Sequence, residues 1–312
     1  MRILVTGAAG FMGSYLCEEL LKSGYEVFGI DNLFRGKKSN LPKHKKFKFY
    51  EIDLNFSNEL QELLQEIKPE VIYHYAAING TKYFYDIPFK VFSENVQMTV
   101  NLLNSTPKST KKVIYASSSE IYGPTPKTPT SEDEKIELNI NALRDSYAAS
   151  KVMGEFYVKL WAEENNRSYI ILRPFNTYGP RMATNGYGQV IPEFIERIKT
   201  EEQFYMFGNG EQTRSFCHVH DHAEIAVEIL SRVENEILNI GFDEEITIKN
   251  LAEYIFKALK KPIKITHKEE WPNDTKWRKP CLKKLKSYVG EKRYISLEEG
   301  INQVLNYKSH QS

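Results

Sequence analysis

Residues 2–13 read RILVTGAAGFMG, and this stretch decides the fold. The apolar run at 2–6 stops at a glycine and is typical of a buried strand, while residues 11–23 carry Leu16, Leu20 and Leu21 at helical spacing. The start of a helix offers unpaired N–H groups and the positive end of the helix dipole, and glycines let a phosphate group approach the backbone closely. The stretch therefore predicts a strand, a tight turn and a helix that hold the diphosphate of a dinucleotide.

An acidic residue follows at the distance that a dinucleotide site requires. A second predicted strand, 25–30, ends at Asp31, which stands 18 residues after Gly13. A carboxylate there accepts hydrogen bonds from a ribose diol and repels a 2′-phosphate, which favours NAD over NADP. Arg35 and Lys37 lie nearby and would favour NADP, so the preference for NAD rests on Asp31.

Strands and helices alternate along the first half of the chain. Apolar runs that predict strands lie at 47–52, 70–76, 112–117 and 168–173, and helical patterns lie near 58–67, 88–104 and 146–165. Short connections between such elements imply parallel strands with right-handed crossovers. The strands show little alternation of polar and apolar residues, as expected when both faces of a sheet are covered. We therefore predict an α/β fold with a Rossmann-type doubly wound parallel sheet.

The character of the sequence changes after Pro174. Residues 174–217 are rich in glycine, proline, asparagine and aromatic residues, and residues 243–312 are rich in lysine. The intervening segment returns to the sheet, with a last strand predicted at 237–241. We expect a NAD-binding lobe made of 1–173 and 218–242, interleaved with a smaller C-terminal substrate lobe made of 174–217 and 243–312.

The composition excludes several classes of protein. The chain has 312 residues, with 42 Lys and Arg against 41 Asp and Glu, and its net charge of +1 argues against general nucleic-acid binding. Cys17, Cys217 and Cys281 are far apart, which excludes a disulfide scaffold and indicates a reducing compartment. No apolar run reaches the roughly 18 residues of a membrane span, and MRILVTG is too short for the core of a signal peptide. We expect a cytoplasmic protein with no nucleic-acid or membrane partner.

A second chemical signal combines Ser118 with Tyr147 and Lys151. Tyr147 and Lys151 stand four residues apart in a predicted helix, so their side chains share a face. An ammonium group beside the phenol, together with a positively charged nicotinamide ring, lowers the pKa of the tyrosine. Tyr147 is then a candidate general base toward a hydroxyl group whose carbon gives up a hydride to NAD. Ser118 follows the fifth predicted strand, at the carboxyl edge of the sheet where doubly wound folds bind ligands.

Motifs over nearly the whole chain resemble those of the extended short-chain dehydrogenase/reductases, in particular the NAD-dependent nucleotide-sugar epimerases and dehydratases. These motifs are TGxxGxxG at 6–13, DNL at 31–33, DL at 53–54, HYAA at 74–77, SSSEIYG at 117–123, YAASK at 147–151, RPFNTYGPR at 173–181 and QTRSF at 212–216. The resemblance implies NAD as cofactor, a nucleoside-diphosphate sugar as substrate, no metal, and oxidation of the sugar C4 hydroxyl by Tyr147 and bound NAD as the first step.

The resemblance also assigns roles to single residues. It makes Ser118, Tyr147 and Lys151 catalytic. The cofactor would contact Gly7, Gly10, Phe11, Met12, Gly13, Asp31, Asn32, Asp53, Leu54, Ala76, Ala77, Asn95, Tyr147 and Lys151. The substrate would contact Ser118, Ser119 and Tyr147, and its diphosphate would be held by Asn176, Arg214 and Arg278.

Glu120 bears on the reaction that follows the first step. Simple 4-epimerases often carry small residues after the catalytic Ser or Thr, whereas 4,6-dehydratases of the GDP-mannose type and UDP-glucuronate decarboxylases tend to read Thr-Ser-Glu. This chain reads Ser118-Ser119-Glu120. After oxidation at C4 the C5 hydrogen is acidic, so Glu120 is a candidate catalytic base for loss of water, and equally a candidate for a contact to the sugar.

Several functions therefore remain open. The leading interpretation is an NAD-dependent nucleotide-sugar epimerase or dehydratase. A UDP-glucuronate decarboxylase-like enzyme and a nucleotide-sugar C4 dehydrogenase are alternatives, because all of these reactions begin with oxidation at C4. A non-catalytic dinucleotide-sensing protein is disfavoured because Ser118, Tyr147 and Lys151 are all present.

A histidine-rich segment resembles a metal site. His218, His220 and His222 alternate as ligands on a strand would. The resemblance implies instead a strand followed by V-x-D at this point, with Asp221 as the N-cap of a helix over 222–231.

The predicted helices near 91–105 and 146–165 match those through which the family forms dimers by a four-helix bundle. Val152, Phe156, Val158 and Trp161 give the second helix more apolar surface than one contact with a sheet requires. We therefore expect a homodimer.

Overall fold

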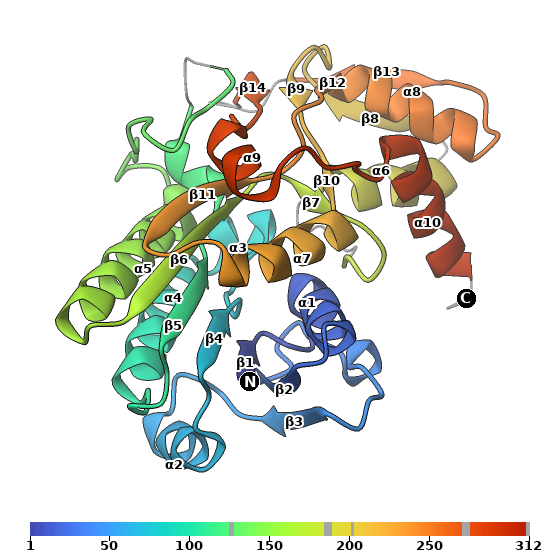
Figure 1. Ribbon diagram of the computed structural model, residues 1–312. Helices are drawn as coiled ribbons and strands as arrows, with labels where there is room; N and C mark the ends of the chain where they lie inside the picture. The colour runs from blue at the N-terminus through green and yellow to red at the C-terminus, as the bar shows by residue number, and fades with distance from the viewer. Residues whose placement is uncertain (125–127, 184–188, 201–202, 270–274, 310–312) are drawn as a thin grey trace.

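A seven-stranded parallel sheet forms the centre of the molecule (Figure 1). The computed structural model describes residues 1–124, 128–183, 189–200, 203–269 and 275–309. The strands of the sheet are β1 (Arg2–Thr6), β2 (Glu26–Asp31), β3 (Phe47–Glu51), β4 (Val71–His74), β5 (Lys112–Ala116), β6 (Ser168–Pro174) and β11 (Glu236–Ile240). They lie in the order β11-β6-β5-β4-β1-β2-β3, and each neighbouring pair is parallel. The predicted Rossmann-type doubly wound sheet is confirmed.

The order of the strands reverses between β1 and β4. The chain runs from β1 outward through β2 to β3, and then returns to the other side of β1 with β4, β5 and β6. At such a reversal the loops after two adjacent strands diverge and leave a crevice at the carboxyl edge. The loops approach closely at its base, since a Cβ atom built on Gly7 would lie 2.9 Å from the backbone nitrogen of Ala76.

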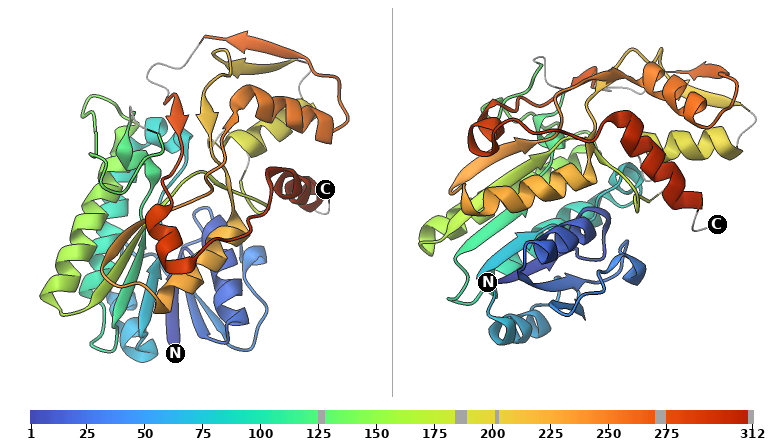
Figure 2. Two further views of the ribbon diagram at one scale, coloured as in Figure 1. Left: turned by 45° about the horizontal axis from the view of Figure 1, so that its top comes forward. Right: turned by 45° about the vertical axis from the view of Figure 1, so that its right-hand side comes forward.

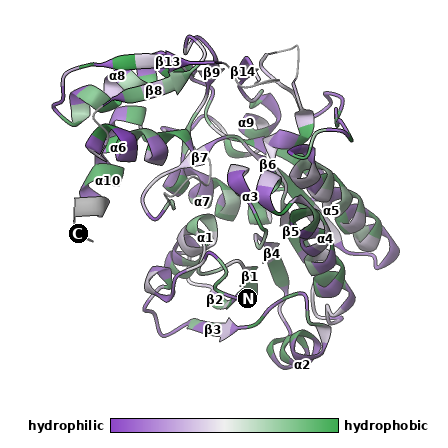
Figure 3. Ribbon diagram, turned by 180° about the vertical axis from the view of Figure 1, so that it is seen from behind, coloured by the Kyte–Doolittle hydropathy of each residue, from purple (hydrophilic) through white to green (hydrophobic). Residues whose placement is uncertain are grey.

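Three helices cover one face of the sheet. They are α2 (Ser57–Ile67), α4 (Pro88–Asn104) and α5 (Asp145–Glu164). Leu64, Leu102 and Val158, one from each helix, are fully buried against the strands. Figure 3 shows α4 and α5 side by side. Of the residues expected to leave α5 with spare apolar surface, Phe156 is exposed, whereas Val158 is buried and Val152 and Trp161 pack partly against the core.

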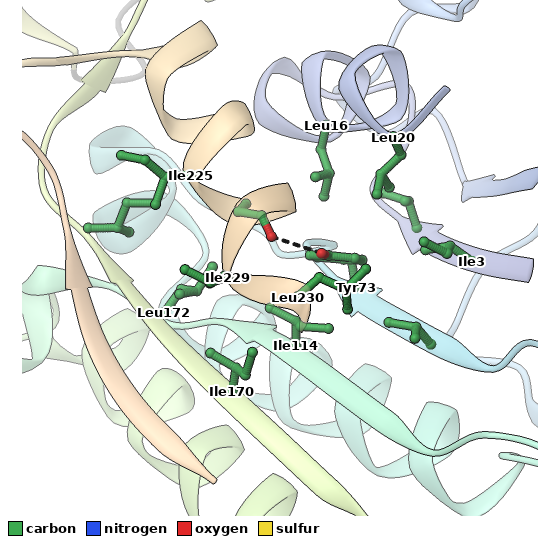
Figure 4. Packing of buried hydrophobic residues seen from close by; sticks show 14 of the residues in the cluster. Ile3, Leu16, Leu20, Tyr73, Ile114, Ile170, Leu172, Ile225, Ile229 and Leu230 are labelled. Atoms are coloured by element: carbon green, nitrogen blue, oxygen red, sulfur yellow. Dashed lines mark hydrogen bonds between the residues drawn. The ribbon is translucent and has the colours of Figure 1, made fainter. Parts of the chain in front are cut away.

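The opposite face is covered by α1 (Phe11–Lys22), α7 (Val219–Glu228), the short turn η3 (Ile229–Ser231) and α9 (Lys283–Val289). Figure 4 shows Ile3, Leu16 and Leu230 around Tyr73 in this core. The Tyr73 hydroxyl donates a hydrogen bond to the Ala226 carbonyl at 2.8 Å, which satisfies the polar end of a buried ring. Helix α9, which comes late in the sequence, therefore packs against the central sheet.

A smaller body with its own apolar core lies beside the sheet (Figure 2). Phe194, Leu251 and Ile301 are buried together there. They come from α6 (Val190–Thr200), α8 (Ile248–Ala258) and α10 (Leu297–Ser309). Short strands complete this body: β8 (Phe204–Phe207) with β13 (Ile265–Lys268), and β9 (Thr213–Arg214) between β12 (Ile246–Thr247) and β14 (Trp277–Arg278). A further short pair, β7 (Thr177–Tyr178) with β10 (Cys217–His218), follows β6 and precedes α7.

Three details differ from the sequence predictions or add to them. A one-and-a-half-turn helix, α3 (Thr81–Asp86), precedes α4, and 3-10 turns η1 (Lys38–Asn40) and η2 (Ser119–Tyr122) follow β2 and β5. The prediction that Asp221 caps a helix over 222–231 is wrong, because α7 begins at Val219 and the His218 ring accepts the capping hydrogen bond from the His220 N–H. Asp221 instead accepts a hydrogen bond from the Ile295 N–H at 3.0 Å, which ties α7 to the chain before α10.

Within the part of the chain that the structure describes, every helix is too short or too polar to cross a membrane.

A buried ion pair joins α5 to β6 beneath the carboxyl edge. The Arg173 guanidinium donates to both carboxylate oxygens of Glu155, at 3.0 and 2.8 Å, and also to the Tyr122 hydroxyl. Both charged side chains are almost fully buried. A buried charge that loses its partner is costly, because water cannot solvate it.

We predict that Glu155→Gln lowers the free energy of unfolding by about 3 kcal/mol, since it leaves the Arg173 charge buried without a counter-ion. Glu163→Gln, on the same helix, removes an exposed pair with Lys159 at 4.0 Å and is expected to cost less than about 0.5 kcal/mol. Urea unfolding followed by circular dichroism measures both changes. Equal losses of stability in the two variants would contradict this account of the pair.

Candidate active site

One large cleft of about 1470 Å³ runs along the carboxyl edge of the sheet and into the smaller body. Its walls include the glycine turn after β1, the ends of β2, β4 and β5, and residues of α3, α5, α6 and β9. The cleft therefore joins the crevice where doubly wound folds bind dinucleotides to a second compartment in the smaller body.

The glycine turn is built for close approach to an anion. Gly7 has φ +71, a conformation that favours glycine, and its carbonyl accepts a hydrogen bond from the Gly10 N–H at 3.0 Å. A Cβ atom on Gly13 would overlap that same carbonyl, so the packing of α1 on the turn requires glycine there. Gly7, Gly10, Phe11, Met12 and Gly13 all line the cleft at the start of α1. The turn thus has the features of a diphosphate cradle.

Asp31 stands at the end of β2, where the sequence predicted a ribose contact. Its carboxylate accepts hydrogen bonds from the Ala9 and Leu33 N–H groups at 3.0 and 2.8 Å and faces the cleft. Burial raises the pKa of Asp31, and the backbone N–H groups oppose that shift. Nearby, the Asn32 side chain donates to Asp53 at 3.0 Å, and both residues line the cleft.

Two buried hydroxyl groups at the other end of the crevice need a partner. Ser117 Oγ and Thr177 Oγ1 are buried and have no hydrogen-bond partner among the described residues, although both side chains belong to the lining of the cleft. Buried polar groups are normally satisfied, so orphaned hydroxyls in a cleft indicate a missing polar ligand. Together with the glycine turn and Asp31, they fit a dinucleotide that extends from β2 to β5.

Of the other predicted cofactor residues, Leu54, Ala76 and Ala77 also line the cleft. Asn95 does not. Its side chain is buried and bonds the Ile78 N–H at 2.7 Å, the Ile78 carbonyl at 3.2 Å and the Ser150 hydroxyl at 3.2 Å. Asn95 therefore fastens the loop after β4 to α5, and its direct contact with the cofactor stays a prediction.

The three predicted catalytic side chains meet in this cleft. Ser118 lies just beyond β5, and its hydroxyl is hydrogen-bonded to the Tyr147 hydroxyl. Lys151 follows one turn later on α5; its Nζ donates to the Ala116 carbonyl at 2.8 Å and lies 5.8 Å from the centre of the Tyr147 ring. The spacing of four residues thus brings the phenol and the amine onto one helix face, as predicted.

The pKa values in the protein alone differ from the sequence argument. Burial raises the pKa of Tyr147 above its usual range, because desolvation of the phenolate outweighs the hydrogen bond from Ser118. Burial also lowers the pKa of Lys151 to about 7. The chain by itself therefore does not favour the phenolate, and a cationic nicotinamide ring beside Tyr147 would supply the charge that does.

Glu120 is held between two arginines, Arg144 and Arg278. Arg144 Nη2 lies 3.1 Å from Glu120 Oε2, and Arg278 Nη1 is in direct contact with Glu120 Oε1. The Glu120 N–H donates to the Ser118 hydroxyl at 3.2 Å, so the ion cluster directly adjoins the catalytic serine. The two guanidinium groups lower the pKa of Glu120 to about 2, against the effect of burial.

Arg144 was missed by the sequence analysis, although a signal was present. It stands three residues before Tyr147, immediately before α5, and a cation at the start of a helix is unfavourable for the helix dipole. An arginine at this unfavourable position suggests that a nearby acidic group pairs with it, and the structure shows that this group is Glu120.

The predicted diphosphate residues lie in the second compartment. Asn176 and Arg214 line the cleft, and the Asn176 side chain donates to the Ser215 carbonyl at 2.9 Å. Arg278 is the cross-strand partner of Arg214 in the pairing of β14 with β9. Its contact with Glu120 is one that the sequence did not indicate, so its role toward the diphosphate stays a prediction. Ser119 lines the cleft next to Ser118.

The histidine segment does not assemble a metal site. Within the described residues no group of three or more histidine, cysteine or carboxylate side chains is placed to hold a metal ion. His218 and His220 stack at 5.4 Å, while His222 meets the Tyr75 hydroxyl at 3.0 Å. These rings belong to the packing of α7.

Known proteins resemble the chain along its whole length. Residues 3–241 match the NAD dependent epimerase/dehydratase family. A UDP-N-acetyl-alpha-D-glucosaminuronate decarboxylase of Bacillus cytotoxicus is 33% identical over 98% of this chain and 97% of its own length. A UDP-glucuronic acid decarboxylase of Xenopus tropicalis is 32% identical over 98% of this chain and 72% of its own length.

Solved structures agree with this relationship. A UDP-glucose 4-epimerase of Thermotoga maritima with UDP-glucose superimposes with a TM-score of 0.91 and 29% identity, over 100% of this chain and 99% of that one. A UDP-glucuronic acid 4-epimerase of Bacillus cereus, in complex with UDP-glucuronic acid and NAD, gives 0.88 and 30%, over 100% of both chains. With the glycine turn, Asp31 and the Ser118–Tyr147–Lys151 group in place, the chain belongs to the NAD-dependent epimerase/dehydratase family and is an enzyme that uses NAD to act on nucleotide sugars.

Proposed function

We propose that this enzyme decarboxylates the sugar acid of a UDP-linked uronic acid. The observation that carries the proposal is the position of Glu120 between Arg144 and Arg278, beside Ser118 and Tyr147. Two guanidinium groups and one carboxylate leave a net positive charge there. A neutral hexose has no charged group that would pair with this positive charge, whereas a uronic acid has a carboxylate on C5 that would.

The low pKa of Glu120 favours decarboxylation over dehydration. Dehydration requires a base that removes the C5 hydrogen, and a carboxylate with a pKa of about 2 is a weak base. Decarboxylation removes CO₂ from C5 and needs no such base. We therefore propose that Glu120 holds Arg144 and Arg278 in place and does not abstract a proton.

The proposed reaction is balanced in atoms and electrons. Tyr147, which is hydrogen-bonded to Ser118, takes the proton of the C4 hydroxyl. When bound, NAD⁺ accepts the hydride from C4 and later returns it. The resulting C4 ketone lies β to the carboxylate, so the bond from C5 to the carboxylate breaks, CO₂ leaves, and the electron pair moves onto the ketone as an enolate. C5 of the enolate then takes a proton from solvent water, and Tyr147 returns its proton to the C4 oxygen as C4 is reduced, which gives a UDP-pentose.

The second compartment of the cleft suits the nucleotide. Phe207 offers an aromatic ring, Asn176 and Arg214 offer N–H groups, and all three residues line the cleft. We propose that Asn176 and Arg214 bind the diphosphate, that Arg278 contributes from the neighbouring strand, and that the base lies toward Phe207. The UDP form is proposed from the substrates named for the relatives.

A 4-epimerase of UDP-uronic acids is the second candidate. It would use the same first step and the same positive charge, and the Bacillus cereus relative is named for this reaction. The two candidates differ in product, since epimerisation keeps the carboxyl carbon.

We also propose that the chain forms a homodimer through α4 and α5. Apolar side chains on these adjacent helices are exposed, with Phe89 83% and Phe156 59% accessible, and Met153 and Leu160 continue the stripe on α5. Large exposed side chains in a row on one face indicate a surface that another protein covers.

We predict that, in a panel of UDP-, GDP-, CDP- and dTDP-sugars, UDP-glucuronate is converted to a product that is lighter by one CO₂. The amount of NAD should not change. Mass spectrometry of the reaction products measures the loss of mass. Tyr147→Phe is expected to lower kcat by about 100-fold or more, because the phenol is the only proton acceptor placed at C4 by the proposal. A product of unchanged mass from UDP-glucuronate would instead support the epimerase.

We predict that Arg144→Met weakens binding of UDP-glucuronate by about 10- to 100-fold, the usual cost of losing a hydrogen bond to a charged group. Binding of UDP-xylose, which has no carboxylate, is expected to change less than about twofold. Titration calorimetry measures both, and Lys135→Met, a charge removal at an exposed site of the same loop, is the control. Equal weakening of both ligands by Arg144→Met would rule out a carboxylate contact.

We predict that the protein sediments as a dimer and that Phe156→Glu makes it monomeric, because a charge in an apolar interface is strongly unfavourable. Lys257→Glu, at an exposed position of α8 in the smaller body, should leave the dimer intact. Analytical ultracentrifugation distinguishes the states, and a monomeric unmodified protein would count against the proposed assembly.

A further inference from the structure

We propose that Phe34, Arg35, Tyr83 and Lys90 form an aromatic clasp that slows the release of bound NAD. The Phe34 and Tyr83 rings lie 5.5 Å apart at 39°, within the range of favourable aromatic pairs. Arg35 lies over the Tyr83 ring at 5.8 Å, and the Lys90 ammonium lies over the Phe34 ring at 5.1 Å. All four residues line the cleft.

The clasp joins two segments that are far apart in the sequence. Phe34 and Arg35 follow Asp31 in the loop after β2, whereas Tyr83 belongs to α3 and Lys90 to the start of α4. The loop after β2 is itself fixed to the glycine turn, since the Lys37 N–H donates to the Ala9 carbonyl at 3.0 Å. The ring contact therefore connects the wall of the cleft that carries Asp31 to the wall that carries α3.

The α3 side of the clasp is in turn fastened to the catalytic helix. Phe84 stacks on the Tyr147 ring, with centroids 4.7 Å apart and an angle of 15°. Both of these rings are buried, in a small cluster with Ile78 and Val91. A dinucleotide that reached from Asp31 to Tyr147 would thus run between two walls that the contact of Phe34 with Tyr83 holds together.

Exposure shows which part of the clasp can open. Phe34 is 45% accessible and lines the cleft, so its ring is not buried in an apolar core. Tyr83 packs partly against the buried cluster of Ile78, Phe84, Val91 and Tyr147, whereas Phe34 belongs to none of the buried clusters, so the clasp opens by movement of Phe34 and the loop after β2. Opening the clasp therefore costs little free energy, so that the cofactor can enter. The closed clasp raises the barrier to release of the cofactor.

Retention of the cofactor suits the chemistry of this family. A reaction that removes a hydride from C4 and later returns it leaves the cofactor unchanged, so exchange of NAD between turnovers has no use. The inference depends on NAD binding and not on whether the sugar is a uronic acid, so the two proposals fail independently.

The test measures the dissociation rate of nicotinamide nucleotide from the loaded protein. Protein loaded with NADH is mixed with excess NAD⁺, and the loss of NADH fluorescence gives the rate. Phe34→Ala and Tyr83→Ala are each expected to speed dissociation by ~3- to 10-fold, as expected for one aromatic pair. Because either single variant already removes the contact between the two rings, the double variant should speed dissociation by clearly less than the product of the two single effects.

Two further variants keep the test specific. Tyr83→Phe retains the ring and should release NADH more slowly than Tyr83→Ala does. Tyr85→Ala removes an exposed ring from the same helix that does not line the cleft, and it should also leave the rate unchanged. Unchanged rates in Phe34→Ala and Tyr83→Ala would overturn the proposal, and so would a double variant whose effect equals the product of the two single effects, because the rings would then contact the cofactor separately.

Discussion

The contact of Glu120 with Arg144 and Arg278 is the interaction on which the functional account depends. It joins the end of β5, the start of α5 and strand β14 of the smaller body beside the catalytic hydroxyl groups. The contact thus fixes how the smaller body meets the sheet at the place where the sugar would react. These three side chains together carry one positive charge, while the chain as a whole is almost neutral.

Sequence alone predicted the parts of the site that depend on short-range patterns. The glycine turn, Asp31 at the end of β2, and the pair Tyr147 and Lys151 are each defined by spacing within one strand, turn or helix. Spacing fixes such arrangements because a helix has a constant period and parallel strands end at a common edge. The predicted strands and the long helices agree with the structure within a few residues for the same reason.

The parts that were missed or wrong depend on contacts between distant segments. The resemblance assigned Asn95 to the cofactor, but it gave no sign that the Asn95 amide bonds Ile78 and Ser150. Glu120 and Arg278 are 158 residues apart and meet only because β14 pairs with β9. The pairing of Phe34 with Tyr83 likewise requires the loop after β2 and the helix α3 to face each other across the cleft. The periodicity of the sequence within one segment carries no information about contacts between distant segments.

The most direct test of the proposed chemistry follows the atoms of UDP-glucuronate labelled with carbon-13 in its carboxyl group, in D₂O, by NMR. The account predicts that the label leaves the sugar as CO₂ and bicarbonate and that the UDP-pentose carries one deuterium at C5, beside the original hydrogen. Retention of the label in a UDP-uronic acid with inverted C4 would contradict decarboxylation.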